Sequence, residues 1–208
     1  MKTEWKWLDW ARRLQTIAQN GLLYATTSYD QERYKTVKEI AAEILVSGSK
    51  IDQKQILQIF SAQTGYATPK VDTRGVVFKD DLILLVKEKE DGGWTLPGGW
   101  ADPSETPSQA VAREVYEESG FVVKPTKLLA VYDRTLHGHT PPHPFRIYKH
   151  FFLCEILGGK SQISPETLDV GFFLEDKIPP LSLGRTTPSQ ISRLFEHRRN
   201  PNWPTDFD

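Results

Sequence analysis

The sequence predicts an α/β domain that is preceded by a small all-α domain. Apolar residues recur at helical spacing through residues 1–65, whereas runs of β-branched and aromatic residues separated by turn signals begin after residue 70. Helices interrupt these strands without alternating with them regularly, which is typical of an α/β/α sandwich around a mixed sheet. At 208 residues, the chain is long enough to bury a substantial core.

Three helices are expected in the N-terminal domain, residues 1–65. The first has an apolar face formed by Trp7, Trp10, Ala11, Leu14, Ile17 and Ala18. The second starts with a capping box at Ser28 and Gln31 and ends at residues 47–49, before a shorter third helix near residues 56–60. Three short helices make a thin core, so we expect this domain to pack on something else. Capping of the sheet and formation of a homodimer both remain open.

Residues 66–70 are expected to form a linker, and residues 71–208 the second domain. Strands are predicted near residues 72–78, 82–88, 94–96, 127–133, 147–156 and 169–174. One helix is predicted shortly after Gly99, and a last one from Thr187 with Pro188 in its first turn. The C-terminal tail is expected to be irregular.

The composition gives no indication of a nucleic-acid or membrane partner, although it does not exclude nucleic acid. The net charge is −1, and no apolar run approaches the length of a membrane span. Cys154 is the only cysteine, and its apolar surroundings indicate a buried, inert thiol. The N-terminus lacks the apolar stretch of a secretory signal. We therefore expect a cytoplasmic location.

The segment GWADPSETPSQAVAREVYEESGF, residues 99–121, carries the strongest chemical signal. Glu114, Glu117 and Glu118 are three and four residues apart, so they share one helix face and repel one another. A hard divalent cation would make this arrangement favourable, since Mg²⁺ prefers carboxylates together with phosphates and water. Gly98 and Gly99 let the backbone approach a phosphate closely, next to the N–H groups of a helix N-terminus. The segment therefore predicts a site for a metal–pyrophosphate complex.

The spacing within this segment matches a known motif. Gly99, Glu105, Arg113-Glu114-Val115, Glu117-Glu118 and Gly120-Phe121 occupy every fixed position of the Nudix box. The sequence therefore resembles the Nudix hydrolases over residues 70 to about 198. The resemblance implies a Nudix α/β/α sandwich that hydrolyses a nucleoside diphosphate linked to a moiety X. It also implies Mg²⁺, with Mn²⁺ able to substitute, held by Glu114, Glu117 and Glu118, and a loop–helix–loop fixed by Glu105 and Arg113.

The general base is left open by this resemblance, because Nudix enzymes use either a box glutamate or a carboxylate from a later loop. Glu166, in SPETLDVGFF, is the main later candidate, and Glu175 is the second. An acidic residue on a solvated surface loop is the alternative interpretation of each.

The N-terminal helices give a looser indication of the substrate. The opening TEWKWLDWARRLQTIAQNGLLY resembles that of a bacterial group of CDP-choline or ADP-ribose pyrophosphatases. A quaternary ammonium binds aromatic faces. The candidates to supply these faces, with core packing as the alternative interpretation, are Trp94, Trp100, Tyr132 and Tyr148. The presence of these aromatic residues favours CDP-choline, cleaved to CMP and phosphocholine, as the substrate. ADP-ribose is the alternative.

A Pro- and Gly-rich loop at residues 133–152 is a second candidate for substrate binding. Three of its histidines, His137, His139 and His143, have a spacing that lacks the frame of common zinc motifs, so contacts to the substrate are the preferred interpretation over zinc. Arg134 and Arg146 are candidate phosphate partners. We expect substrate contacts from Gly98, Gly99, Trp100, Arg134, His137, His139 and Arg146.

Two other functional classes compete with a small-nucleotide hydrolase. An RNA 3′-end exonuclease would need a basic groove with interleaved aromatics, and RLFEHRR at residues 193–199 is the only basic run. A non-catalytic nucleotide sensor tends to have lost box glutamates, whereas this box is intact. The sequence therefore favours an enzyme acting on a small nucleotide.

Overall fold

The computed structural model describes residues 5–49 and 52–208, and the chain divides into two compact units. The first comprises Met1–Pro69 with Pro142–Arg146, and the second comprises Lys70–Pro141 and Ile147–Asp208. Residues 142–146, which the sequence-based boundaries assign to the second domain, contact the N-terminal helices instead. Arg12 donates a 2.6 Å hydrogen bond to the His143 carbonyl, and the rings of Phe60 and Phe145 lie 6.0 Å apart.

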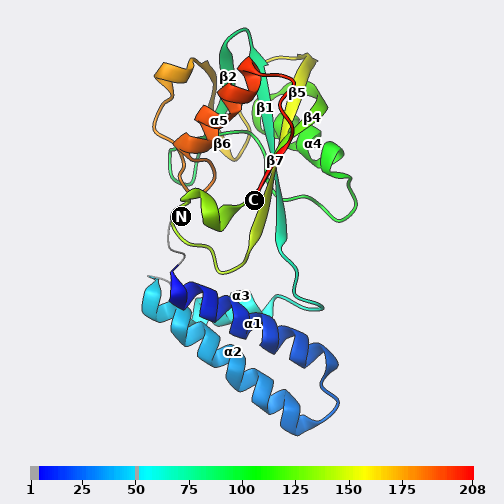
Figure 1. Ribbon diagram of the computed structural model, residues 1–208, viewed down its shortest axis with the longest axis vertical. Coiled ribbons are helices and arrows are strands. Elements are labelled where there is room, and N and C mark those ends of the chain that lie inside the picture. The colour runs from blue at the N-terminus through cyan, green and yellow to red at the C-terminus, as the bar shows by residue number, and fades with distance from the viewer. Residues whose placement is uncertain (1–4, 50–51) are drawn as a thin grey trace. The chain divides into compact units, whose positions relative to one another are not determined.

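The first unit contains the three expected helices, α1 (Lys6–Tyr24), α2 (Ser28–Gly48) and α3 (Gln53–Ser61) (Figure 1). The cap of α2 lies one residue earlier than predicted, because the Thr27 side chain accepts from the Asp30 backbone N–H. The core is formed by Leu8, Ala11, Ala41, Ala42, Leu45, Ile56 and Phe60. Trp10 and Ile17, which the helical spacing placed on the apolar face, are instead exposed, since α2 covers a different side of α1.

The second unit is built on a mixed sheet of seven strands. In chain order these are β1 (Lys70–Lys79), β2 (Leu82–Glu88), β3 (Trp94–Thr95), β4 (Phe121–Asp133), β5 (Ile147–Gly159), β6 (Thr167–Phe173) and β7 (Asp206–Phe207). The spatial order is β3-β2-β1-β5-β4-β7, and β6 pairs with β2. The β1–β5 and β4–β7 pairs are parallel and the other pairs are antiparallel.

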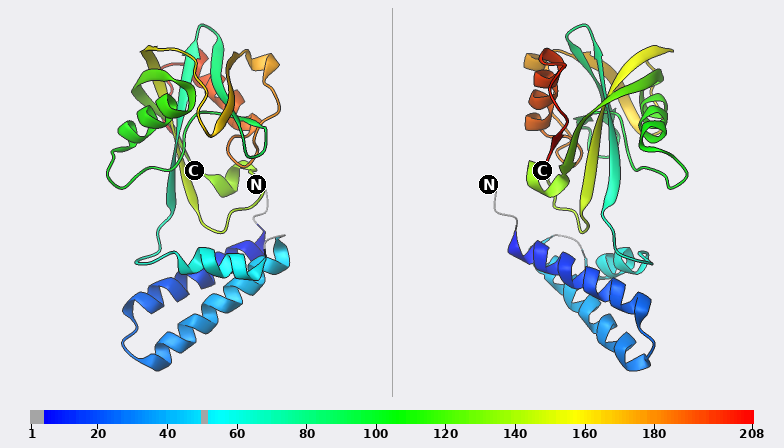
Figure 2. Two further views of the ribbon diagram at one scale, coloured as in Figure 1. Left: turned by 180° about the vertical axis from the view of Figure 1, so that it is seen from behind. Right: turned by 45° about the vertical axis from the view of Figure 1, so that its right-hand side comes forward.

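Helices cover both faces of this sheet, which confirms the predicted sandwich. Adjacent residues of a strand point to opposite faces, so Val77 packs in the cluster with Val115 of α4 (Pro107–Ser119), whereas Val76 packs with Leu194 of α5 (Pro188–Arg199). The right-hand view of Figure 2 shows the two helices on either side of the sheet. No helix of the described part of the chain is long and apolar enough to cross a membrane.

The C-terminal tail is more ordered than expected. Its strand β7 pairs with β4, and the Asp206 carboxylate accepts hydrogen bonds from Tyr132 Oη at 2.9 Å and Arg193 Nε at 2.6 Å. Cys154 is free and buried on β5, and burial raises the pKa of its thiol to about 12, as expected of an inert cysteine.

Candidate active site

The box helix α4 begins and ends at signals that lie within the motif itself. Thr106 and Gln109 form a capping box, and Pro107 occupies the first helical turn. Gly120 ends the helix in the left-handed conformation, with φ of 77°. The local sequence therefore determines where Glu114, Glu117 and Glu118 lie along the helix.

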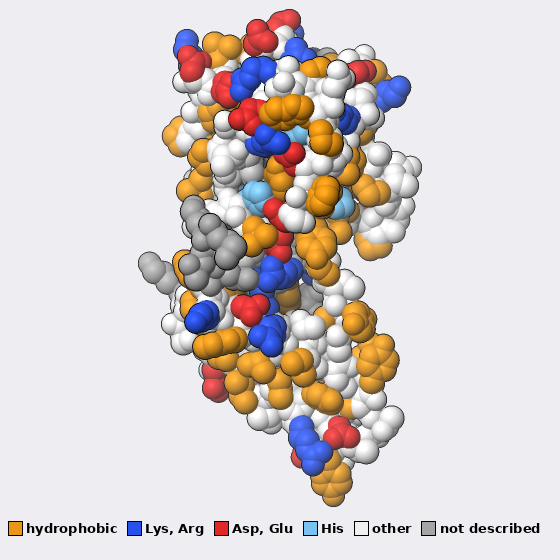
Figure 3. Space-filling model, viewed as in Figure 1, with side chains coloured by type: hydrophobic (Ala, Val, Ile, Leu, Met, Phe, Trp, Pro, Cys, Tyr) orange, Lys and Arg blue, Asp and Glu red, His pale blue; other side chains and the backbone are white. Residues whose placement is uncertain are grey.

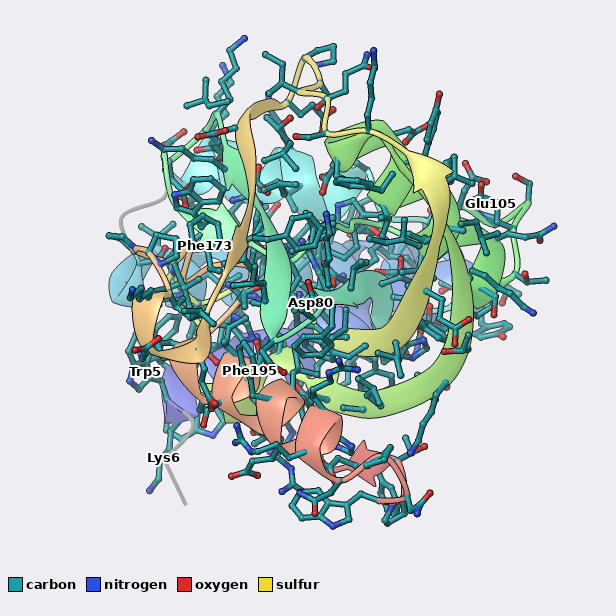
Figure 4. The ribbon with its side chains drawn as sticks, turned by 90° about the horizontal axis from the view of Figure 1, so that it is seen from above. Trp5, Lys6, Asp80, Glu105, Phe173 and Phe195 are labelled. Carbon is teal, nitrogen blue, oxygen red and sulfur yellow. The ribbon has the colours of Figure 1, made fainter. Side chains whose placement is uncertain are left out.

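Arg113 is the centre of a network of carboxylates. Its Nε and Nη2 donate to the two oxygens of Glu105 at 2.8 and 3.0 Å, which is a bidentate pair. Its Nη1 donates to Glu114 at 2.9 Å and to Glu117 at 2.8 Å. Glu105 comes from the loop that leads into α4, well away from Phe195 of α5 (Figure 4). One guanidinium thus ties this loop to two of the three box glutamates.

Glu118, the third box glutamate, lies in a different environment. Its carboxylate accepts a 2.8 Å hydrogen bond from the Gly98 backbone N–H, and only 7% of the residue is exposed. Burial raises the pKa of Glu118 to about 8; nearby Glu88 and Glu114 raise it further, and Arg74 counteracts the rise. A buried carboxylate with this pKa is short of positive charge in the metal-free protein.

The loop before the box lies directly against β1. The Thr73 N–H donates to the Gly99 carbonyl and the Gly75 N–H to the Pro97 carbonyl, both at 2.8 Å. Gly98 has φ of 144°, and a Cβ there would lie 2.0 Å from the Thr73 carbonyl oxygen. A Cβ on Gly99 would lie 2.9 Å from Glu114 Oε2. Gly98 therefore brings the backbone closer to β1 than any other residue would allow, whereas at Gly99 the Glu114 carboxylate would have to shift.

A buried charge network behind this loop has no counterpart in our sequence-based expectations. Asp72 accepts hydrogen bonds from Arg74 at 2.7 and 2.8 Å and from Lys149 Nζ at 2.7 Å. Burial acts to raise the pKa of Asp72, but the two cations hold it well below its usual range. Burial, followed by the charge of Arg74, lowers the pKa of Lys149 to about 7. Arg74 also donates to the Leu96 carbonyl at 3.0 Å, so the network supports the loop that leads to Gly98.

A second cluster missed by the sequence analysis lies at the end of β2. Glu88 is buried, and burial raises its pKa, whereas Arg185 at 3.2 Å lowers it. Arg185 also donates to Glu90 at 2.6 Å. The only signal in the sequence was the charged pair Lys87-Glu88 directly after the apolar run LILLV.

The two later-loop carboxylates have different surroundings. Glu166 is exposed, and its backbone carbonyl accepts from the Lys89 N–H at 3.0 Å. The next residue, Thr167, donates to the Glu118 carbonyl at 3.3 Å, so this loop is anchored at the end of the box helix. Glu175 is instead paired with Arg199 at the end of α5.

Arg134 and His139 of the 133–152 segment bond backbone carbonyls within the second unit. Arg134 donates to the carbonyls of Pro141 at 2.8 Å and Gly184 at 3.2 Å, and His139 contacts the Leu183 carbonyl at 3.0 Å, so both tie two loops together. Burial, with a smaller effect of Lys149 and Arg134, lowers the pKa of His139 to about 3. His137 contacts Asp208 at 2.9 Å.

His143 and Arg146 belong to the first unit, where Arg146 lies 3.8 Å from Asp9. In the described part of the chain no three His, Cys, Asp or Glu side chains are grouped to hold a metal ion, so the contacts of these histidines give the zinc alternative no support.

The aromatic residues divide into two kinds. Trp94 packs edge-on against Phe173, with ring centroids 4.7 Å apart, and Tyr132 is buried. Both serve the core. Trp100 and Tyr148 are 52% and 42% exposed, so only these two retain accessible aromatic surface.

The box glutamates suit a hard cation by their donor chemistry, although their side chains do not converge. Over residues 5–49 and 52–208, no three Asp, Glu, His or Cys side chains are grouped to hold one ion. The reason is visible in the contacts: Arg113 draws Glu114 and Glu117 together, while Glu118 turns to Gly98. The buried, raised-pKa carboxylate of Glu118 is what a divalent cation would satisfy.

Residues 69–195 match the family described as the NUDIX domain. The chain belongs to the Nudix family. Residues 5–60 match a second family, described as a UDP-X-like, N-terminal oligomerisation domain. The resemblance stated from the box and from the N-terminal helices is thereby confirmed, and the protein is a Nudix pyrophosphohydrolase. Enzymes of this family generally use a divalent metal ion.

Relatives of this Nudix hydrolase span both of its units. YjhB of Bacillus subtilis, whose name carries a provisional assignment as an ADP-ribose pyrophosphatase, is 43% identical over 100% of both chains. A solved UDP-X diphosphatase is 29% identical and covers 97% of this chain and 98% of its own, with a TM-score of 0.63. An ADP-ribose pyrophosphatase of Streptococcus suis is 42% identical, covering 68% of this chain and all of its own, with a TM-score of 0.62.

Proposed function

We propose that this Nudix hydrolase cleaves the pyrophosphate bond of a nucleoside diphosphate linked to a second moiety, with ADP-ribose as the leading substrate. The observation that carries the proposal is the intact box held against the Gly98 loop, where the buried Glu118 carboxylate needs a cation. The choice of ADP-ribose rests on the names of YjhB and of the Streptococcus suis enzyme. It departs from the aromatic argument for choline, since Trp94 and Tyr132 are committed to the core.

Mg²⁺, with Mn²⁺ able to substitute, is the proposed cofactor. Glu114, Glu117 and Glu118 would hold it, and a metal of this kind lowers the pKa of a bound water and neutralises phosphate charge. Arg113 orients Glu114 and Glu117 through its two hydrogen bonds. Gly98 and Gly99, in the loop before the box helix, are the proposed backbone contacts to the phosphates.

Glu166 is the proposed general base. Its loop is anchored to the end of the box helix by the bond from Thr167 to the Glu118 carbonyl, and its side chain is exposed. Glu175 is a poorer candidate because its carboxylate is held by Arg199. If Glu166 takes the proton of the attacking water, Glu166→Gln should lower kcat and change KM much less.

CDP-choline is retained as the second candidate substrate because of Trp100. This exposed indole directly follows the box glycine, and a quaternary ammonium prefers an aromatic face. Trp100→Leu should therefore raise KM for CDP-choline and leave KM for ADP-ribose nearly unchanged. Equal effects on both substrates would contradict a choline-binding role.

Product analysis by HPLC tests the substrate. The protein and Mg²⁺ are offered ADP-ribose, CDP-choline, NADH, a dinucleoside polyphosphate and a short RNA in parallel. Fastest release of AMP from ADP-ribose supports the proposal, whereas CMP from CDP-choline replaces it with the second candidate. Shortened RNA would instead favour the exonuclease. Binding of a nucleotide without cleavage would favour the sensor.

The protein is further proposed to form a homodimer in the cytoplasm. The dimer is supported by the oligomerisation family that residues 5–60 match. The location is supported by the single, buried cysteine, which is consistent with a reducing compartment.

A further inference from the structure

Helix α1 has two apolar sides, and only one of them is covered within its own unit. Leu8, Ala11 and Ala18 are buried against the other helices of the unit. Trp10, Ile17 and Tyr24 are 53%, 54% and 70% exposed. Because they are seven residues apart, or two helical turns, they form one line along the outside of the helix, which we name the α1 stripe.

A groove runs beside this stripe, between α1 and α2. It has a volume of about 550 Å³, and its lining includes Ile17, Gly21, Tyr24 and Tyr34. The Tyr34 ring lies against Gly21, where a Cβ would come within 2.3 Å of it. The Tyr34 ring thus occupies the space that a side chain at Gly21 would fill, and it forms one wall of the groove beside Ile17 and Tyr24. Figure 3 shows hydrophobic side chains gathered along the helices of the first unit.

We infer that the α1 stripe is the surface on which a second copy of this chain packs, with the two α1 helices antiparallel about a two-fold axis near Ile17. The inference rests on the proposed homodimer and adds the face that forms it. Exposed apolar surface of this kind marks an interaction site, and residues 5–60 match a family described by its oligomerisation. The stripe lies within that range.

The spacing of the stripe suits a two-fold axis. Trp10 and Tyr24 lie equally far from Ile17, seven residues on either side. In an antiparallel pair, Ile17 therefore meets Ile17 of the partner subunit, and each Trp10 meets the partner's Tyr24. Such a self-complementary arrangement closes after two copies, which distinguishes a dimer from a filament. The groove beside Gly21 can receive one of the large aromatic side chains of the other copy.

Ile17→Glu tests the stripe, with Leu157→Glu as its matched control. Leu157 is an aliphatic residue of similar exposure, 65%, on β5 of the second unit. Two glutamates facing each other across the axis should weaken dimerisation at least about 100-fold. Light scattering after gel filtration, at several protein concentrations, is expected to give twice 23.8 kDa for wild type and for Leu157→Glu, and 23.8 kDa for Ile17→Glu. Circular dichroism and melting temperature verify that both variants are folded.

The outcomes separate the two levels of the proposal. A wild-type monomer at all concentrations overturns the homodimer itself. A wild-type dimer that survives Ile17→Glu overturns the stripe and leaves the homodimer standing. Ile17→Cys tests the antiparallel pairing with a short bismaleimide, since Cys154 is buried and does not compete. Cross-linked dimer from Ile17→Cys, and none from Leu157→Cys, supports the axis near Ile17, whereas its absence overturns that axis.

Discussion

The backbone N–H of Gly98 donates a 2.8 Å hydrogen bond to the carboxylate of Glu118, across 20 residues of sequence. This bond joins the loop that follows β3 to the last turn of α4. It explains how a glutamate can be buried beside a backbone turn, because the turn supplies a donor to its carboxylate. The local chemistry of the box depends on this relationship.

Glu118→Gln should leave the fold intact and lower turnover at least about 100-fold at limiting Mg²⁺, because a neutral amide is a poor metal ligand. The amide oxygen can still accept from Gly98, and because a buried amide cannot ionise, the melting temperature of the metal-free protein should stay unchanged or rise. Steady-state rates over a Mg²⁺ titration and a thermal melt measure both effects. Glu43→Gln, on the exposed side of α2, is the control. Near-full activity of Glu118→Gln would show that the metal-ligand assignment is wrong.

Gly98→Ala should destabilise the protein by about 3 kcal/mol or more and remove most activity. The new Cβ would lie 2.0 Å from the Thr73 carbonyl oxygen, so the loop must move away from Glu118. Gly92→Ala is the matched control, because Gly92 also has a positive φ, 70°, but has nothing within 4 Å of the added Cβ. Backbone strain alone should cost roughly 1–2 kcal/mol there. Urea unfolding of both variants gives the comparison, and equal losses would refute the steric argument.

Asp72→Asn should cost about 3–5 kcal/mol, since two buried cations would lose the carboxylate that both of them contact. Lys149→Met should cost no more than about 1–2 kcal/mol, because Asp72 keeps both bonds from Arg74. Chemical unfolding distinguishes the two. If Lys149→Met proves the more damaging change, the charge network is not organised around Asp72.

Arg113→Lys should lower kcat about 10–100-fold, because a lysine cannot hold Glu105 in a bidentate pair while also bonding Glu114 and Glu117. The stability should fall by only about 1 kcal/mol, since the side chain is partly exposed. Arg33→Lys, in an exposed pair with Asp30, is the control for loss of a guanidinium. Activity equal to wild type would mean that Arg113 does not position the glutamates.

The contribution of Glu118 to the stability of the metal-free protein should fall as pH rises from 4.5 through about 8. Glu118 has a pKa raised from 4.5 to about 8 by burial, so in this window the folded chain keeps a proton that the unfolded chain releases. Metal binding requires the carboxylate and should therefore increase over the same range. Melting temperatures with and without Mg²⁺ should diverge more above pH 8 than below it. The same divergence in Glu118→Gln would exclude Glu118 as the cause.

Much of the fold followed from local sequence patterns. Helix α4 begins at the capping box of Thr106, with Pro107 in its first turn, and ends at the left-handed Gly120. These signals act between residues a few positions apart. The helical spacing of Glu114, Glu117 and Glu118 was likewise a property of the chain itself. These features could be predicted because neighbouring residues alone create them.

Contacts between distant segments could not be predicted in this way. The parallel register of β1 and β5 sets Asp72 opposite Lys149, 77 residues away, and no local pattern specifies that register. The same holds for His139 and Arg134, which seemed suited to substrate and instead bond the carbonyls of other loops.

The sequence by itself therefore determined the family, the box helix and the position of its carboxylates along that helix. Only the tertiary structure decided that Glu118 is buried beside Gly98, that Asp72 joins two buried cations, and that Trp10 and Ile17 lie on the outer side of α1. The physical reason is the separation along the chain of the residues that interact. Helix caps and periodicity depend on residues within two turns, whereas burial, strand register and charge pairing depend on which distant segments the fold brings into contact.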